Sequence, residues 1–508
     1  MKMTFMITWL RSISFRSLMG CWLALALTWG TGPAMAIDPF FPTFGNNGID
    51  VIHYNIDLDV DPVSGQVDGK TAIMIRAQQR LSRFKLDLHA LAVSNVTING
   101  IAAGFSQADD KLTITPHRPI PAGNIFRLGI DYGGVPDPLP DPTAPNDELF
   151  LGWFKYQDAS YVVSEPVGAS SFFPANDEPT DKASYTFGIT VPDGYTGVAN
   201  GFFVGSKRVG AKRRFEWAML QPMTAWLATV HVNKFELDLT HAPDGTPIRI
   251  YAPAGVPQSH IDVYAKAGPM ITYFETLIGR YPFASYGSVI VEDPLLYYPL
   301  ETQAMSTFPA DTNSPDELLV AHELAHQWFG NSISVAKWED LWIAEGSATY
   351  FEMLWKNRDN PAAFDDAMLE IYDYVVDQQV GPAVVDAPDQ LFSERTYYRG
   401  AATLYALRLK VGDSSFFNIL RHFVQDNRGG NITSKDFIRT AEHFSGDGSV
   451  RPLLHAWLYD DAVPALPNLA RRAAKRGPVA RPDIVGGRCG RGSHRGSPVD
   501  CKVEVIAP

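Results

Sequence analysis

Cysteine is almost absent from this chain: there are three in 508 residues, and none between residues 22 and 488. A disulfide scaffold needs many paired cysteines, and a structural zinc site is commonly closed by four ligands that include cysteine. We therefore expect the main body to depend on neither. Cys489 and Cys501 could form a disulfide in an oxidising compartment, but the bond would lie near the C-terminus and would not hold the core together.

Long apolar runs are absent as well. Near the N-terminus, LMGCWLALALTWG has about a dozen apolar residues, whereas a membrane-spanning helix needs about 20. Basic residues precede this run, and the small residues AMA at 34–36 follow it, which is the pattern of a secretory signal peptide. We therefore expect residues 1–36 to direct export to the periplasm or the medium. We expect no integral membrane segment after cleavage.

Positive charge is scarce, with 43 Lys and Arg against 56 Asp and Glu and a net charge of −13. Both ends of the chain are net positive, so the body between them is more acidic still. An acidic body argues against nucleic-acid binding. The C-terminal residues 466–508 are rich in Arg, Gly and Pro and show no periodicity, so we expect a disordered basic tail.

Histidine is also scarce, with 12 residues, yet two lie one helical turn apart. In SPDELLVAHELAHQWFG, which we expect to form a helix from an N-cap at Ser314 to a stop at Gly330, His322 and His326 flank Glu323. Residues four apart share one helix face, so the two imidazoles should point together. A simple polar patch would explain two histidines, but the full H-E-x-x-H pattern favours a metal site.

A third ligand is available in KWEDLWIAEGSATYFE. Glu345 follows His326 after 18 intervening residues, in a second segment with a helical pattern. Two histidines and one glutamate are a ligand set of catalytic zinc sites, in which the fourth position stays open for water. The sequence therefore predicts one Zn²⁺ per chain, bound by His322, His326 and Glu345.

The stretch HELAHQWFGNSISVAKWEDLWIAEG resembles the zinc signature of the aminopeptidase N family, the gluzincin aminopeptidases that include leukotriene hydrolase. Thermolysin-like endopeptidases share the ligand spacing, but they have an aspartate four residues after the ligand glutamate, where this chain has Thr349. The resemblance therefore favours an aminopeptidase. It implies that Glu323 is the catalytic general base.

Three further stretches resemble the family in the same order along the chain. YYPLETQAMSTF has Glu301 at the glutamate of the family's Gly-Ala-Met-Glu-Asn motif, although the other four positions differ. SEPVGASSFFPANDEPTDKASYTFGITVP resembles the Phe-Pro-x-x-Asp-Glu-Pro segment, with Glu165 at a position that helps bind the substrate amine. TYYRGAATLYAL has Tyr397 at the catalytic tyrosine, and Arg399 replaces the family's lysine.

The pattern of the body changes along its length. VIHYNIDLDV and similar stretches alternate apolar and polar residues, as strands with one buried face do, whereas helical patterns dominate from about residue 258. We expect an α+β fold with a β-rich N-terminal domain, residues 37–245, and a thermolysin-like catalytic domain, residues 246–465. Longer relatives have a large C-terminal helical domain, for which this chain has too few residues, so its site should be more open.

The sequence thus predicts an exported zinc aminopeptidase that hydrolyses the N-terminal residue from peptides with a free amino terminus. Glu301 and Glu165 would bind the substrate's ammonium. Two alternatives remain: a thermolysin-type endopeptidase, which would cleave blocked peptides, and a non-catalytic peptide-binding protein on the same fold. The sequence indicates nothing about the oligomeric state.

Overall fold

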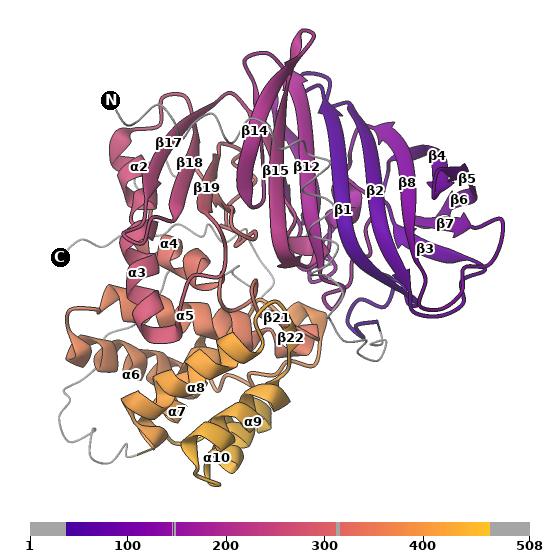
Figure 1. Cartoon of the computed structure of the whole chain (residues 1–508). Helices are drawn as coiled ribbons and strands as arrows, with labels where there is room; N and C mark the ends of the chain where they lie inside the picture. Colours follow the sequence, from indigo (N-terminus) through magenta and orange to yellow (C-terminus); the bar gives the residue numbers. More distant parts are fainter. Residues whose placement is uncertain (1–36, 145, 147–148, 311–314, 468–508) are drawn as a thin grey trace, which may run out of the picture. The chain divides into compact units, whose positions relative to one another are not determined.

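The computed structural model describes residues 37–467, except for 145, 147, 148 and 311–314. The predicted signal peptide lies outside these residues, and so does the predicted tail beyond residue 467. Strands fill most of the chain as far as Pro253, and helices with short strands among them follow from Gln258 (Figure 1). This arrangement agrees with the predicted α+β class.

The largest sheet has eight strands in the order β14-β15-β12-β1-β2-β8-β4-β5, and β1 with β12 is its one parallel pair. Buried and partly exposed side chains alternate from Tyr54 to Val60 on β1, as predicted. A bulge between Val51 and His53 shifts the register, so that Val51 is buried and Ile52 is not. The strands are β1 (Ile49–Val60), β2 (Val67–Ala77), β4 (Ala92–Ile98), β5 (Ile101–Ala102), β8 (Ile125–Gly134), β12 (Ala183–Pro192), β14 (Phe202–Val209) and β15 (Lys212–Met223).

Two smaller sheets flank loop segments that carry residues of the site described below. Their orders are β13-β16-β11-β10-β9 and β17-β18-β19-β20. The strands are β9 (Leu139–Pro140), β10 (Phe150–Tyr156), β11 (Ala159–Val163), β13 (Thr196–Ala199), β16 (Val230–Asn233), β17 (Phe235–His241), β18 (Pro247–Pro253), β19 (Tyr286–Val291) and β20 (Ser306–Pro309). The remaining strands are β3 (Phe84–Asp87), β6 (Gly104–Ala108), β7 (Lys111–Thr115), β21 (Ser334–Val335) and β22 (Asn431–Ile432). The domain boundary predicted near residue 246 falls in the turn between β17 and β18 and stays a prediction.

The helices of the second half gather around α5, which is buried along nearly its whole length (Figure 1). Asn360 caps α6 by accepting a hydrogen bond from the N–H of Ala363, and α8 begins at Asp413. No helix in the described part of the chain has the length and apolar content to cross a membrane. The α-helices are α2 (Gln258–Ala265), α3 (Ala267–Ile278), α4 (Glu317–Ala325), α5 (Trp342–Lys356), α6 (Pro361–Asp377), α7 (Gly400–Val411), α8 (Asp413–Asp426), α9 (Ser434–Ser445) and α10 (Val450–Tyr459). Shorter turns are η2 (Ala169–Ser171), η3 (Ala225–Leu227), η4 (Trp338–Asp340), η5 (Pro388–Gln390) and the π-helix η6 (Arg395–Arg399).

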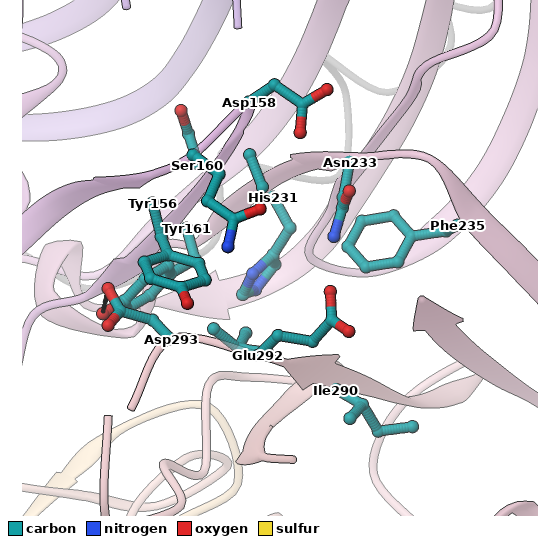
Figure 2. A pocket seen from close by; sticks show the side chains of 13 residues that line it. Tyr156, Asp158, Ser160, Tyr161, His231, Asn233, Phe235, Ile290, Glu292 and Asp293 are labelled. Carbon is teal, nitrogen blue, oxygen red and sulfur yellow. Dashed lines mark hydrogen bonds between the residues drawn. The ribbon is translucent and has the colours of Figure 1, made fainter. Parts of the chain in front are cut away.

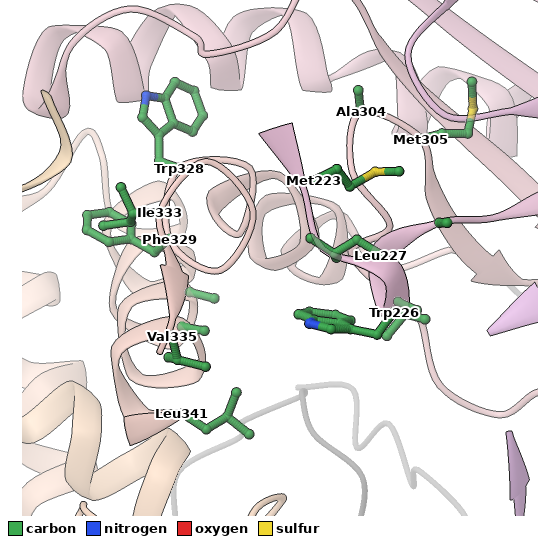
Figure 3. Close-up of a cluster of buried hydrophobic side chains, with 14 of the residues drawn as sticks. Met223, Trp226, Leu227, Ala304, Met305, Trp328, Phe329, Ile333, Val335 and Leu341 are labelled. Atoms are coloured by element: carbon green, nitrogen blue, oxygen red, sulfur yellow. The ribbon is translucent and has the colours of Figure 1, made fainter. Parts of the chain in front are cut away.

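A continuous apolar core joins the two halves of the body. Met223, Trp226 and Leu227, from the end of β15 and from η3, belong to the same buried cluster as Phe329 and Ile333, which follow α4 (Figure 3). The ring of Trp226 lies 5.4 Å from that of Trp338, centroid to centroid. Burial of such large side chains contributes roughly 1.5–3 kcal/mol each. The core therefore fixes the connection between α4 and α5, the two helices that carry the predicted metal ligands.

Candidate active site

The helix that carries both histidines, α4, is shorter than the sequence predicts. Its N-cap is Asp316, whose carboxylate accepts the main-chain N–H of Leu318; the predicted cap, Ser314, lies outside the described residues. It ends at Ala325 and not near Gly330, because the main-chain N–H groups that follow no longer all bond four residues back: those of Gln327 and Trp328 bond three residues back, and those of residues 331–333 bond five residues back. His322 therefore lies in the last turn and His326 at the C-cap, where they still face the same side.

Both imidazoles direct Nε2 to one point. His322 Nδ1 lies 3.2 Å from Oε2 of Glu352, and His326 Nδ1 lies 3.1 Å from the carbonyl oxygen of Phe329. A carboxylate and a carbonyl only accept hydrogen bonds, so each Nδ1 carries a proton, and in the neutral imidazole each Nε2 then has a free lone pair. This tautomer is the one that a histidine needs to bind a metal through Nε2.

Glu345, on α5, completes a three-ligand cluster with the histidines. Its Oε2 lies 3.4 Å from Nε2 of His322 and 3.5 Å from Nε2 of His326. Tetrahedral ligands about 2.0–2.1 Å from a zinc ion lie about 3.3 Å from one another. The cluster therefore fits a single zinc ion, and all three side chains are buried.

Glu323 lies next to this cluster. Its Oε2 is buried and has no hydrogen-bond partner among the described residues. Burial, against the opposing effect of His322 and His326, raises the pKa of Glu323 to about 8. A cation held by the cluster would lower that pKa, because an opposite charge favours the carboxylate. Glu323 is thus placed to accept a proton beside a bound metal.

Two further carboxylates, those of Glu301 and Glu165, lie close to the ligand cluster. Ligand oxygens of Glu165, Glu301 and Glu345 all lie within 4.8 Å of one another, although Glu165 and Glu301 are 136 positions apart in the sequence. The main-chain oxygen of Glu301 accepts hydrogen bonds from the amides of Gln327 and Asn331. Its Oε1 is buried without a hydrogen-bond partner among the described residues. Grouped carboxylates of this kind are suited to a cationic ligand.

Tyr397 lies on η6, a single π-helical turn between η5 and α7. Its ring is nearly parallel to the imidazole of His322, at 21° and 6.1 Å between centroids. Turns of π-helix are frequent at functional sites because they redirect one side chain from a regular helix. The turn brings Tyr397 to the ligand cluster, as the sequence predicts, while Tyr398 lies against Tyr374 instead.

Arg399, which replaces the family's lysine, is completely buried at the end of η6. Its guanidinium donates to main-chain carbonyls at and after the C-terminal end of α10, including that of Trp457 at 3.0 Å, and to the carbonyl of Val380 at 2.7 Å. An arginine offers five N–H donors and a lysine three, so this side chain can satisfy more carbonyls. It ties the turn that carries Tyr397 to the end of the described chain.

These groups share one cavity of about 340 Å³. All seven residues that the sequence singles out as ligands or catalytic and substrate-binding groups line it, so the fold brings every one of them together. Tyr298, Pro299 and Leu300 stand at positions where the family motif has other residues, and they form part of the wall. The lining residues are Glu165, Tyr298, Pro299, Leu300, Glu301, His322, Glu323, His326, Glu345, Phe392 and Tyr397.

Sequence reasoning missed Glu352, Gln327 and Asn331. Glu352 lies seven residues after Glu345, two helical turns along α5 and on the same face, which is a signal that could have identified it. Gln327 holds the main-chain oxygens of Glu301 and Glu323 and accepts the N–H of Ala304 through Oε1. These side chains position the site residues without lining the cavity.

Comparisons with known proteins match these features. Residues 51–227 match the Peptidase M1 N-terminal domain, and residues 284–457 match the Peptidase family M1 domain. Aminopeptidase A of Gloydius brevicauda is 24% identical over 474 residues, which are 83% of this chain and 47% of that protein. Aminopeptidase N of Acetobacter pasteurianus is 24% identical over 59% of this chain and 88% of its own length. The chain thus spans about half the length of the snake relative.

Solved structures agree in fold. An M1 zinc metallopeptidase from Deinococcus radiodurans superposes with a TM-score of 0.78 at 29% identity and covers 85% of this chain and 99% of its own. A mutant of the Deinococcus enzyme was solved bound to the substrate Tyr-Ser-Ala. The two domain matches, in their expected order, together with the shared fold and ligand motif, lead to one conclusion: this chain belongs to the M1 peptidase family.

Proposed function

We propose that this protein is a zinc-dependent aminopeptidase that removes the N-terminal residue from peptides. The observation that carries the proposal is one cavity in which three groups meet: a three-ligand metal cluster, a carboxylate pair, and a buried glutamate whose Oε2 has no hydrogen-bond partner among the described residues. Family membership supports a peptide hydrolase, and the relatives named above are aminopeptidases or zinc metallopeptidases.

We assign one Zn²⁺ to His322, His326 and Glu345, because the donor types and their separations fit a tetrahedral ion with one open position. When bound, zinc supplies Lewis-acid chemistry that acidifies water and polarises a carbonyl. The hydrogen bonds that both Nδ1 atoms donate hold the imidazoles in the tautomer that can bind a metal through Nε2.

Glu323 would be the general base and acid. Its Oε2, which lacks a partner among the described residues, can accept the proton of the attacking water and then deliver it to the leaving amine. The Tyr397 hydroxyl would donate a hydrogen bond to the carbonyl oxygen as negative charge develops on it. Both side chains line the cavity beside the ligand cluster.

Glu301, with Glu165, would bind the ammonium of the substrate. A buried ammonium needs paired carboxylates, and Glu301 Oε1 is buried without a hydrogen-bond partner among the described residues. An amine held at this end of the cavity fixes the register, so that only the first peptide bond reaches the metal. This register makes the enzyme an exopeptidase.

A panel of fluorogenic aminoacyl amides, assayed with and without a chelator, tests the function. We expect turnover that chelation abolishes and zinc restores, with acetylated peptides cleaved poorly. Efficient cleavage of acetylated peptides would favour the endopeptidase alternative, and no turnover by zinc-loaded protein on any substrate would favour a binding protein.

We also propose that residues 1–36 are a signal peptide and that the protein is periplasmic or secreted. The basic start, the short apolar run and the AMA sequence support this proposal. Fractionation of cells that express the full chain, followed by N-terminal sequencing, should find a mature protein that begins near Ile37. An intact N-terminus in the cytoplasm would contradict it.

A further inference from the structure

A second cavity, of about 390 Å³, lies between strands β11 and β16 and the end of β19 (Figure 2). It shares no lining residue with the candidate active site. At its centre is the imidazole of His231, which lies between Tyr161 and Phe235 in the view of Figure 2, with Glu292 extending beneath it. None of the four motif blocks of the sequence contributes to this cavity.

His231 presents an unused hydrogen-bond acceptor here. Its Nε2 lies 2.9 Å from the hydroxyl oxygen of Thr229 and 3.3 Å from the hydroxyl oxygen of Thr307. The Thr229 hydroxyl itself donates a hydrogen bond to the carbonyl of Val162. Because the Thr229 proton is committed to Val162, Nε2 must be the donor to Thr229, and Nδ1 holds the lone pair. Nδ1 is buried and has no hydrogen-bond partner in the described part of the chain, and burial lowers the pKa of His231 to about 3, so the ring is neutral. Leaving a buried acceptor without a partner is unfavourable, and a donor from a ligand would remove that cost.

The walls of this cavity carry an excess of negative charge. Asp158, Glu292 and Asp293 line it. Asp293 is buried and accepts the Tyr161 hydroxyl at 2.9 Å, whereas Asp158 is paired with the exposed Lys234. One lysine against three carboxylates leaves the cavity net negative, which favours a cation and disfavours an anion.

The donors of this cavity suit an organic cation and not a metal ion. Among the described residues, three groups have donor atoms close enough to hold a metal, and none of these groups includes His231, Glu292 or Asp293. The donors of this cavity are therefore too far apart to hold one ion, whereas an ammonium or guanidinium on an alkyl chain can span them. The aromatic rings of Tyr161 and Phe235 line the cavity. They can form a cation–π interaction with the charged group and pack against its alkyl chain.

We propose that this cavity binds an alkylammonium or alkylguanidinium group, which donates a hydrogen bond to His231 Nδ1 and balances the charge of Glu292 and Asp293. The group can belong to a small free molecule or to a basic side chain of a peptide. The site is independent of the peptidase chemistry, since a ligand can bind here without reaching the metal cluster.

Titration calorimetry of the zinc-loaded full chain with n-butylguanidinium tests the proposal. This probe has no scissile bond, and the Glu301→Ala variant removes the amine site of the first cavity. We expect saturable binding of one equivalent by Glu301→Ala, at a site that the wild type also has, and at least tenfold weaker binding when Glu292→Lys or His231→Phe is added to Glu301→Ala. Glu236→Lys is the matched control, because Glu236 is an exposed glutamate on β17 that does not line the cavity. This variant should bind n-butylguanidinium with unchanged affinity.

Three results would overturn the proposal: no saturable binding, which would indicate a cavity that holds water alone; binding that Glu292→Lys and His231→Phe leave unchanged; or displacement of the probe by excess zinc. Glu292 is exposed, so its variant should fold even if the His231 variant does not.

The source of the cation is distinguished by kinetics. For a peptide side chain, Glu292→Lys should lower kcat/KM for peptides with an internal arginine and not for their glutamine counterparts, and n-butylguanidinium should compete. For a free molecule, the arginine and glutamine peptides should behave alike while n-butylguanidinium still binds. Either pattern supports a cation site, and together with calorimetry it separates this proposal from the peptidase activity itself.

Discussion

Glu352 should set the zinc affinity although it does not touch the metal. Its Oε2 accepts the Nδ1 proton of His322 at 3.2 Å, and both side chains are buried, so no water can replace the carboxylate easily. Loss of such a partner typically weakens metal binding by about 10- to 100-fold. This range corresponds to roughly 1.4–2.7 kcal/mol, because each tenfold change is about 1.36 kcal/mol.

Two variants separate the charge from the hydrogen bond. Glu352→Gln keeps a neutral acceptor and should weaken zinc binding by about tenfold, whereas Glu352→Ala removes the acceptor and should weaken it by about 100-fold. Competition with a chromogenic chelator measures both affinities without any assay of activity. Glu370→Gln, on the neighbouring α6, is the control and should bind zinc as the wild type does. Zinc affinities equal to the wild type in both Glu352 variants would refute this reasoning.

Four further predictions test the remaining groups. Glu323→Gln should keep one zinc per chain by elemental analysis while kcat falls by roughly two to four orders of magnitude, because the base is lost; unchanged turnover would remove Glu323 from the mechanism. Tyr397→Phe should lower kcat by about two to three orders, whereas the control Tyr398→Phe should not; near-normal turnover would leave Tyr397 with a packing role. Glu301→Ala should lower kcat/KM for a free-amine substrate by about 30-fold or more and barely affect an acetylated peptide, measured on zinc-replete protein; equal proportional losses would mean that Glu301 does not bind the amine. Burial raises the pKa of Asp181 to about 7, so the folded state holds this proton more tightly than the unfolded chain does. The protonated carboxyl group therefore stabilises the fold fully below about pH 4, and this contribution to the free energy of unfolding is lost as the pH rises through 7. Chemical denaturation should show this loss. Asp181→Asn, which keeps an acceptor for the N–H of Val51, should show a smaller loss, because burial also raises the pKa of Asp177 and of Glu178 to about 7.

The sequence alone was enough to predict the metal ligands that we propose. H-E-x-x-H fixes two imidazoles on one helix face through the helical period, and the spacing to Glu345 needs only a second helix packed on the first. Both features are local, so the period of the chain was enough to predict them. The alternation of VIHYNIDLDV predicted a strand for the same reason, although the bulge that exchanges Val51 for Ile52 depends on the pairing partner.

Only the tertiary structure decided which distant groups meet. Glu165 and Glu345 lie 180 positions apart, and no periodicity relates them; only the folded chain brings their carboxylate oxygens within 4.8 Å of each other. The early end of α4, the π-helical turn at Tyr397 and the carbonyls held by Arg399 likewise depend on groups remote in sequence. His231 shows the same limit, because its ring is identified as an acceptor only once Thr229 and Val162 are seen beside it. Local patterns determine elements and ligand spacing, whereas long-range packing determines the neighbours that give each side chain its protonation state and its role.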